Sequence, residues 1–448
     1  MAAASSTYDL SRWKAPFFTI WTGQALSLVG SRIAMFALIW WLTDTTGSAT
    51  VLALATLFAM LPTIVLGPVA GVFVDRWNRK RVMILADGVI ALLSLGLAFL
   101  FWTGQIQVWH VYVVMLAREL GGIFHWPAMQ SSTSLMVPEQ HLARVSGINQ
   151  ALNGGVSIVG PAIGALLLSV TSIANVMLLD VTTALLAIVP LSFVFIPQPP
   201  AAEGDAEQGP ASLWTDLKAG ARYVFGWRGL MILTGVAMLF KIALTPAFSL
   251  LPILVTQHFG GAAPELAAVE SLSGIGLIVG GLLLGVWGGF KRRILTTMFG
   301  VSVIGLAMLI VGLLPSNLLP VALGLMFVLG AAAALTDGPL FAVLQSTVAP
   351  EMQGRVFMLF GSVITLTSPI GLIIAGPVTD AVGVQVWFIA AGIGCLLAGI
   401  AGFFIPSIVH VEEDGKALAA RLSLTPTPAA EEPVAAPEAI PAPGPIGD

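Results

Sequence analysis

Long apolar runs recur along the whole of this 448-residue chain, and they constrain its fold more than any other feature. A run of about 20 apolar residues can cross the hydrocarbon core of a bilayer as a helix. Only helices and closed barrels satisfy their own backbone hydrogen bonds in lipid. Hydrophobic residues make up 57% of the chain, more than a soluble globule of this size would bury. The sequence therefore predicts an all-α membrane protein.

Polar residues divide these runs into twelve expected transmembrane helices in two six-helix bundles. The first six are expected at 17–43, 49–72, 81–103, 108–134, 145–170 and 175–196. The second six are expected at 229–257, 265–290, 294–314, 318–347, 355–380 and 385–406. We therefore expect an N-terminal bundle over 1–196 and a C-terminal bundle over 229–407.

Two polar stretches lie outside these bundles. Residues 197–228 open with Pro-Gln-Pro-Pro and then turn acidic, which is typical of a linker, here a cytoplasmic one. Apolar linker residues that share one helical face predict a short amphipathic helix on the membrane surface: Leu213, Trp214, Leu217, Ala221, Val224 and Phe225. Residues 408–448 are rich in Glu, Pro and Ala, so we expect a disordered cytoplasmic tail.

Positive charge is distributed unevenly along the chain. Of the 19 Lys and Arg residues, three fall inside expected helices, namely Arg32, Arg118 and Lys241. The other sixteen lie in the N-terminal segment, in alternate loops and in the tail. Because Lys and Arg favour the cytoplasmic side of a membrane, we expect both termini in the cytoplasm of a multi-pass cell-membrane protein.

The two halves repeat each other, which makes the predicted bundles pseudo-symmetric. The repeated positions are His125, Pro127, Pro138 and Glu139 in the first half and Asp337, Pro339, Pro350 and Glu351 in the second. Such repeats build transporters whose two bundles rock around a site near the middle of the membrane.

The loop after the second expected helix concentrates charge. It holds four basic residues and one acid in the run Gly71-Val-Phe-Val-Asp75-Arg76-Trp-Asn-Arg79-Lys80-Arg81. Together with the twelve helices and the repeat, this run resembles the Gly-x-x-x-Asp-Arg-x-x-Arg-Arg signature of the major facilitator superfamily. Asp75 can pair with the arginines and with a neighbouring helix end, which would latch the bundles in one state. We group Asp87, about one turn into the next helix, with this latch, although the loop could serve only to orient the chain.

The second half carries a related loop in which the acid is missing. Its sequence is Gly285-Val-Trp-Gly-Gly289-Phe-Lys291-Arg292-Arg293. No latch is expected from this copy.

The fifth expected helix contains Gly160-Pro161-Ala-Ile-Gly164, which is similar to the Gly-Pro-x-x-Gly antiporter signature of the same superfamily. Glycines allow helices to approach closely, and proline bends a helix. The resemblance implies export rather than uptake, although the motif could be a simple packing element.

Three further stretches, at 30–42, 246–252 and 354–357, resemble the macrolide-efflux-type branch of the superfamily. The resemblance implies a monomeric, proton-coupled exporter of an amphipathic small molecule, such as a macrolide-like drug, that works by alternating access. The alternatives are a siderophore or lysolipid exporter of the same fold and a transport-inactive membrane receptor or scaffold.

Ionisable residues inside expected helices are candidate functional groups, because hydrocarbon penalises them strongly. Six are expected to face the central cavity and to serve proton or substrate coupling: Arg32, Arg118, Glu119, His125, Lys241 and Asp337. We expect Glu119 to carry the coupling proton, with Asp337 and Lys241 as the runner-up pair. Cross-helix ion pairs among these groups could instead be only structural. Asp180 and Glu270 lie near outer helix ends, where they are expected to reach water.

Several function classes are not supported by the sequence. There is no Gly-x-x-x-x-Gly-Lys-Ser/Thr loop, so ATP is not expected to drive transport. No metal-ligand spacing and no nucleophile elbow are present. We therefore expect no enzyme activity, no cofactor, no metal and no nucleic-acid partner.

Overall fold

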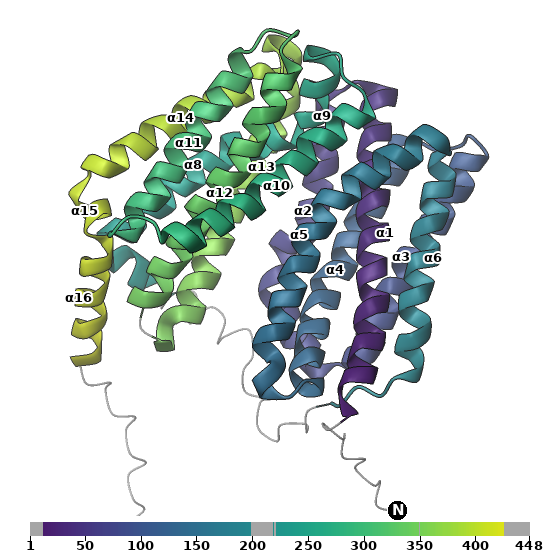
Figure 1. The fold of residues 1–448 in the computed structure, drawn as a ribbon, viewed down its shortest axis with the longest axis horizontal. Coiled ribbons are helices and arrows are strands. Elements are labelled where there is room, and N and C mark those ends of the chain that lie inside the picture. Colours follow the sequence, from purple (N-terminus) through teal and green to yellow (C-terminus); the bar gives the residue numbers. More distant parts are fainter. Residues whose placement is uncertain (1–11, 199–217, 219–220, 349, 425–448) are drawn as a thin grey trace, which may run out of the picture.

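The structure is a computed structural model that describes residues 12–198, 218, 221–348 and 350–424 (Figure 1). Within these residues the chain is helical and has no strand. The first half contains α1 Lys14–Thr46, α2 Ala49–Arg76, α3 Arg79–Trp102, α4 Val108–Met136, α5 Glu139–Val170 and α6 Ile173–Phe193. The long helices of the second half are α8 Arg228–Ser249, α10 Ala263–Trp287, α11 Arg293–Leu313, α12 Leu319–Thr347, α13 Pro350–Val382 and α14 Gln385–Phe404.

Eleven of the described helices are long and apolar enough to cross a membrane. The remaining long helix, α4, has 29 residues but a more polar sequence. It packs against α2 and α3 inside the first bundle. The structure thus confirms an all-α membrane architecture of two bundles, and the expected total of twelve spans depends on α4.

Local signals explain why the first helices begin and end where they do. α1 ends at Gly47, whose φ of 56° is left-handed and whose N–H donates to the Thr43 carbonyl at 2.8 Å. Ser48 then caps α2, because its Oγ accepts from the Val51 N–H at 3.3 Å. Asn78 caps α3 in the same way through the Arg81 N–H at 3.1 Å. These connections are very short, so consecutive helices run antiparallel.

The single helix expected over 229–257 is wrong, because the chain is interrupted there. α8 ends at Ser249, α9 spans Leu251–Ile253 and a π-helical turn, η3, spans Leu254–His258. Pro246 lies near the end of α8, and Pro252 lies in α9. Proline lacks an N–H, so neither residue can donate to a regular helical ladder.

The disorder expected over 408–448 is wrong for its first part. The chain forms α15 Pro406–Val409 and α16 Val411–Leu424. Val411 is fully buried, and its carbonyl accepts from Trp227 Nε1 at 3.1 Å. This packing stabilises a sequence whose composition alone looks unstructured. Residues 425–448 lie outside the described part of the chain.

The expected linker helix is described only at its end. Residues 221–226 are helical, and Val224 is buried beside Trp227 whereas Phe225 is exposed. Leu213, Trp214 and Leu217 lie outside the described residues, so the amphipathic helix stays a prediction.

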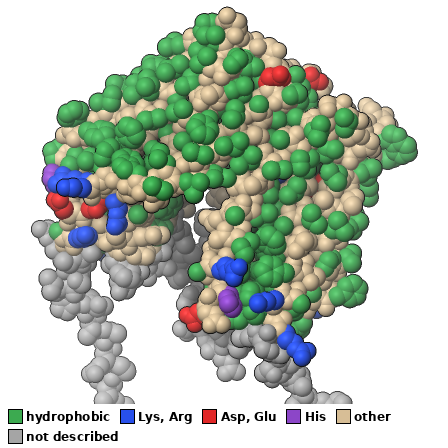
Figure 2. Space-filling view, viewed as in Figure 1, with side chains coloured by type: hydrophobic (Ala, Val, Ile, Leu, Met, Phe, Trp, Pro, Cys, Tyr) green, Lys and Arg blue, Asp and Glu red, His purple; other side chains and the backbone are tan. Residues whose placement is uncertain are grey.

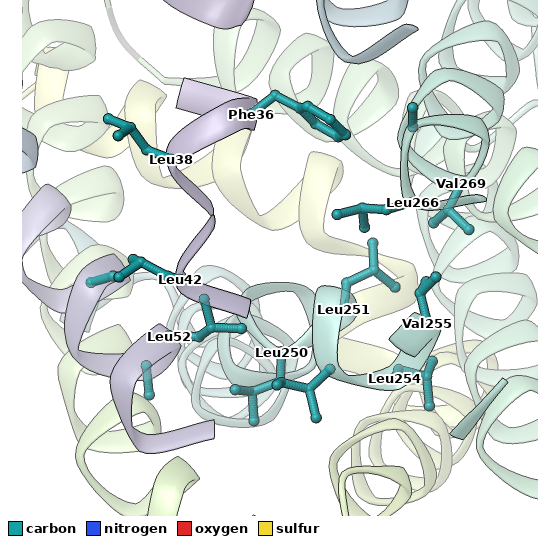
Figure 3. Close-up of a cluster of buried hydrophobic side chains, with 14 of the residues drawn as sticks. Phe36, Leu38, Leu42, Leu52, Leu250, Leu251, Leu254, Val255, Leu266 and Val269 are labelled. Carbon is teal, nitrogen blue, oxygen red and sulfur yellow. The ribbon is translucent and has the colours of Figure 1, made fainter. Parts of the chain in front are cut away.

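A buried apolar cluster joins the two halves at one end of the molecule (Figure 3). Phe36 and Leu42 of α1 and Leu52 of α2 pack in the same cluster as Leu250 and Leu254 of the second half. We call this the far end. The interrupted region from α8 to η3 therefore contributes to the contact between the bundles, beside the packing of α5 on α10 and of α2 on α13.

Hydrogen bonds between the halves reinforce the far end. Gln257 Nε2 of η3 donates to the Gly47 carbonyl at 2.6 Å, and the Oγ atoms of Thr56 and Ser249 are 2.6 Å apart. The Thr50 hydroxyl donates to Asp380 Oδ2 at 3.3 Å. These contacts hold α1 and α2 against α8, η3 and α13.

The opposite end is different in charge and in packing. It carries the starts of α1, α3, α8 and α11 with their basic residues, and we call it the basic end. Figure 2 shows a hollow between the two halves at this end. The bundles thus meet at the far end and diverge toward the basic end (Figure 1).

Candidate substrate cavity and charged clusters

A cavity of about 440 Å³, here the first cavity, opens on the inner face of the first bundle. Helices α1 to α5 line it, with large apolar side chains beside polar ones. The apolar and aromatic lining includes Trp21, Met35, Met115, Trp126 and Met129. Such a mixture suits a ligand that has a large apolar surface and a few polar groups.

The first cavity brings together five of the ionisable residues singled out in the first half. They are Arg32 of α1, Asp87 of α3, and Arg118, Glu119 and His125 of α4. The structure therefore places these side chains on one surface, while their roles in transport stay predictions.

The expected direct ion pairs are not formed. Arg32 and Glu119 line the same cavity, but the described residues include no ion pair between them. Glu119 Oε1 instead accepts a short hydrogen bond from the Thr63 hydroxyl of α2. Arg32 lies at the mouth of the cavity with an exposed side chain.

Arg118 forms a buried ion pair with a residue that the sequence interpretation misplaced. Its Nη1 lies 2.6 Å from Asp180 Oδ2 of α6, and the two side chains are 7% and 0% exposed. Asp180 also accepts from the Ser94 hydroxyl at 2.6 Å and from the Ser31 hydroxyl at 3.1 Å. Asp180 thus does not reach water. An ionisable residue within an apolar helix is a candidate functional group, so Asp180 could have been identified from the sequence. It was not, because it was assigned to a water-exposed helix end.

Asp87 also lies at the cavity rather than at the loop with which it was grouped. Its side chain is buried, and Oδ2 accepts from Gln24 Nε2 of α1 at 2.9 Å. His125 Nε2 of α4 lies 3.4 Å from Oδ1 and has no other polar partner. The two atoms form no hydrogen bond, and the contact is an ion pair only when His125 is protonated. Asp87 therefore connects α1, α3 and α4.

A second cavity of about 430 Å³ lies between the two halves. Lys241 of α8 and Glu270 of α10 line it together with Thr56 and Met60 of α2. Met115 of α4 belongs to both cavities, so the two adjoin. Glu270 is half-buried here and, like Asp180, is not a water-exposed helix end.

Asp337 lies on α12 outside the residues that line these two cavities. It interacts electrostatically with Lys241, but the two form no direct ion pair among the described residues. Arg32 interacts in the same indirect way with Glu270 across the two halves. The cationic side chains of α1 and α8 are thus each near one acid of the second bundle.

The Gly160-Pro161-Gly164 motif packs α5 closely on α1. All three residues are buried. A Cβ atom at Gly160 would lie 3.0 Å from Arg32 Cβ, and one at Gly164 would lie 2.8 Å from Phe36 Cδ1. Glycine at these positions therefore sets the position of Arg32 at the cavity.

The charged loop after α2 contacts its own bundle in this structure. Lys80 Nζ donates to the Ser192 carbonyl at 2.7 Å and the Val194 carbonyl at 2.9 Å, at the end of α6. Arg79 is buried and donates to the Ser131 carbonyl at 3.4 Å, whereas Arg81 is exposed. The side chains of Gly71, Asp75 and Arg76 lie outside the described residues, so the latch stays a prediction.

The described residues contain no group of three or more His, Cys, Asp or Glu side chains that could hold a metal ion.

Known sequences show similarity across most of the chain. The family model described as "Major Facilitator Superfamily" matches residues 20–365 and 230–436. Macrolide efflux protein A of Streptococcus pyogenes is 36% identical over 383 residues, which cover 85% of this chain and 94% of that protein. The Enterococcus faecalis protein of the same name is 34% identical, covering 73% of this chain and all of that one. The multidrug efflux pump Tap of Mycobacterium tuberculosis is 27% identical, with 89% and 95% covered.

Solved structures show the same fold at low identity. The nucleoside transporter NupG superposes with a TM-score of 0.67 at 13% identity, covering 87% of this chain and 100% of that one. A bacterial homologue of the human lysosomal transporter Spinster superposes with a TM-score of 0.60 at 11% identity, covering 93% and 98%. The two bundles, the motifs and the matches together show that the chain belongs to the Major Facilitator Superfamily, in its macrolide-efflux-type branch.

Proposed function

We propose that this protein exports an amphipathic small molecule, such as a macrolide-like drug, in exchange for protons. The observation that carries the proposal is the first cavity, where an apolar and aromatic surface lies beside several charged side chains. The names of the related efflux proteins support the same substrate class.

Transport by alternating access is supported by the way the halves meet. Apolar packing and hydrogen bonds join the bundles at the far end, and a hollow separates them at the basic end. We place the basic end in the cytoplasm of a cell-membrane protein, because Lys and Arg favour that side. In that orientation the structure is open to the cytoplasm, where a drug would enter before export.

The proposed orientation can be measured with single cysteines in a Cys395→Ala background. Arg81→Cys, at an exposed position in the first turn of α3, should resist a membrane-impermeant thiol reagent in intact cells. Gly104→Cys, in the loop between α3 and α4, should be labelled. The reverse pattern would reverse the direction of transport that we propose.

Glu119 is our candidate for the proton carrier. Glu119 directly follows Arg118 in the sequence and lines the first cavity. Among the described residues, its side chain forms a hydrogen bond only with the neutral hydroxyl of Thr63. A carboxylate that is not held in an ion pair can take up and release a proton as its surroundings change. Arg118 is held by Asp180, so its charge is fixed nearby.

A flux assay in proteoliposomes tests the whole proposal. A radiolabelled macrolide should accumulate against its gradient when a pH gradient is imposed, and a protonophore should abolish the accumulation. Empty liposomes provide the control. If no uphill flux occurs at any imposed pH gradient, although the reconstituted protein binds the macrolide, proton-coupled export is excluded. If neither flux nor binding occurs, the proposed substrate class is excluded.

A further inference from the structure

The last described helix folds back on the second bundle. After α14 the chain turns through α15, and α16 lies beside the start of α8. Trp227, which is 1% exposed, donates from Nε1 to the Val411 carbonyl at 3.1 Å. The Trp227 ring also fills the space that a side chain at Gly415 would need. α16 is therefore held against the point where the linker enters the second half.

The first turn of α16 carries three acids, and two of them contact the start of α11. Glu412 Oε1 accepts from the backbone N–H of Arg293, the first residue of α11, at 3.1 Å. Glu413 Oε1 accepts from Arg292 Nη2 at 3.3 Å. Figure 2 shows acidic and basic side chains gathered at this edge of the second half. A carboxylate at a helix start pairs a free N–H and interacts well with the helix dipole.

The contacted loop is the copy of the charged loop that has lost its acid. By the repeat, Gly289 occupies the position of Asp75. Gly289 has a φ of 76°, and a Cβ there would lie 2.7 Å from Thr296 Oγ1. A side chain at 289 would thus be strained in backbone and crowded in space. Residues 285–293 contain no acid, so an acid that pairs with this loop comes from another part of the chain.

We propose that α16 supplies that acid from the end of the chain, with Glu412 as the main group and Glu413 as the lesser one. Glu412 binds a backbone donor at the start of α11. Glu413 is 64% exposed in its pair with Arg292, so water screens that pair. Through Trp227 the same helix also holds the start of α8, so α16 fixes α8 and α11 relative to each other. This role does not depend on the substrate or on proton coupling.

Hydrogen–deuterium exchange on the full chain in detergent tests the proposal. In the double variant Glu412→Ala/Glu413→Ala, backbone amides of residues 289–297 should exchange about tenfold faster, because an N-terminal cap and an ion pair are lost. Alanine favours helix, so α16 does not lose intrinsic propensity. The control is Asp414→Ala, which removes one carboxylate from the same turn, where the described side chain makes no hydrogen bond or ion pair.

The possible outcomes distinguish a local effect at the start of α11 from a general destabilisation of the second bundle. Equal exchange at 289–297 in the double variant and in Asp414→Ala would overturn it, and so would a uniform rise across the whole second half. Glu412→Gln, which keeps an acceptor oxygen, covers the case in which the double variant does not fold. It should raise exchange at 289–297 by roughly threefold, and no rise would also overturn the proposal. In the charge-swap variant Arg292→Glu/Glu413→Arg, the backbone amides of residues 289–297 should exchange more slowly than in Arg292→Glu alone, because the swap restores an ion pair.

Discussion

At the scale of single residues, Arg118 and Asp180 form an ion pair inside the first bundle. Both side chains are buried, and the hydroxyls of Ser94 and Ser31 also donate to the Asp180 carboxylate. Burying two charges is costly, so such a pair adds little net stability. Removing one partner is different, because it leaves an uncompensated charge in a low-dielectric surrounding.

Asp180→Asn should therefore destabilise the protein strongly, by about 3–5 kcal/mol if unfolding is reversible. The measurement is the thermal midpoint in detergent. Asp44→Asn, at the exposed end of α1, removes the same charge and should leave the midpoint unchanged. The double variant Arg118→Met/Asp180→Leu should recover much of the loss, because no lone charge remains. An unshifted midpoint in Asp180→Asn would mean that the pair contributes nothing to the fold.

Glu119→Gln tests a role in coupling rather than in stability. Glutamine keeps an oxygen that can accept from Thr63, so the cavity should retain its shape. It cannot carry a proton, so uphill transport driven by a pH gradient should be lost, while macrolide binding and downhill exchange persist. Asp337→Asn should be milder. Uphill transport that survives in Glu119→Gln and fails in Asp337→Asn would move proton coupling to the second bundle.

At the scale of elements, close packing of α5 on α1 positions the wall of the first cavity. Gly160 and Gly164 face Arg32 and Phe36, with less space than a methyl group normally needs. Other glycines of α5 have no such neighbour: nothing lies within 4 Å of a Cβ built at Gly155. The antiporter-like motif is therefore a close-contact surface as well as a sequence pattern.

Gly164→Ala should cost about 1–3 kcal/mol, since the added methyl group would lie against the buried Phe36 ring and force α1 and α5 apart. Gly155→Ala is the matched control and should leave the thermal midpoint unchanged or slightly raised. Transport by Gly164→Ala should also fall, because Arg32 moves with α1. If Gly164→Ala and Gly155→Ala have the same thermal midpoint and the same transport activity, the α1–α5 contact does not determine the position of the cavity wall.

At the scale of the whole molecule, the two bundles are joined at one end and separated at the other. The far end combines an apolar cluster with hydrogen bonds between α2 and both α8 and α13. Under alternating access, these contacts must break before a substrate could leave through the far end.

A cysteine pair at Thr56 and Ser249 should lock the far end. Their Oγ atoms are 2.6 Å apart, so two sulfur atoms in their place can form a disulfide. In a Cys395→Ala background, oxidation should abolish transport and a reductant should restore it, while either single cysteine should transport under both conditions. Full transport by fully cross-linked protein would show that the far end need not open.

The sequence predicted the fold well because its signals are local: apolar length, caps and basic loops. The charged residues of α4 were found for a similar reason, since an ionisable group in an apolar helix is conspicuous. The partner of Arg118 was not found, because Asp180 is brought to it by packing of α6 against α3. α16 was missed because its composition resembles a disordered tail, and its stability comes from contacts with Trp227 and α11. The π-helical turn after Pro252 depends likewise on neighbours distant in sequence.

The two-residue turn between α1 and α2 has a mechanical consequence. The two helices have 33 and 28 residues, and they are joined by Gly47 and Ser48 alone. At 1.5 Å per residue, α2 is a rod of about 42 Å, so tilting it by about 10° moves its tip by roughly 7 Å. The pivot is the turn itself, so this large displacement falls at the opposite tip of α2, at the basic end. Thr56 lies about 10 Å along α2 from the turn, so the same tilt moves it by only roughly 2 Å. The hairpin therefore acts as a lever, in which a small change at the Gln257–Gly47 and Thr56–Ser249 contacts corresponds to a displacement several times larger at the basic end.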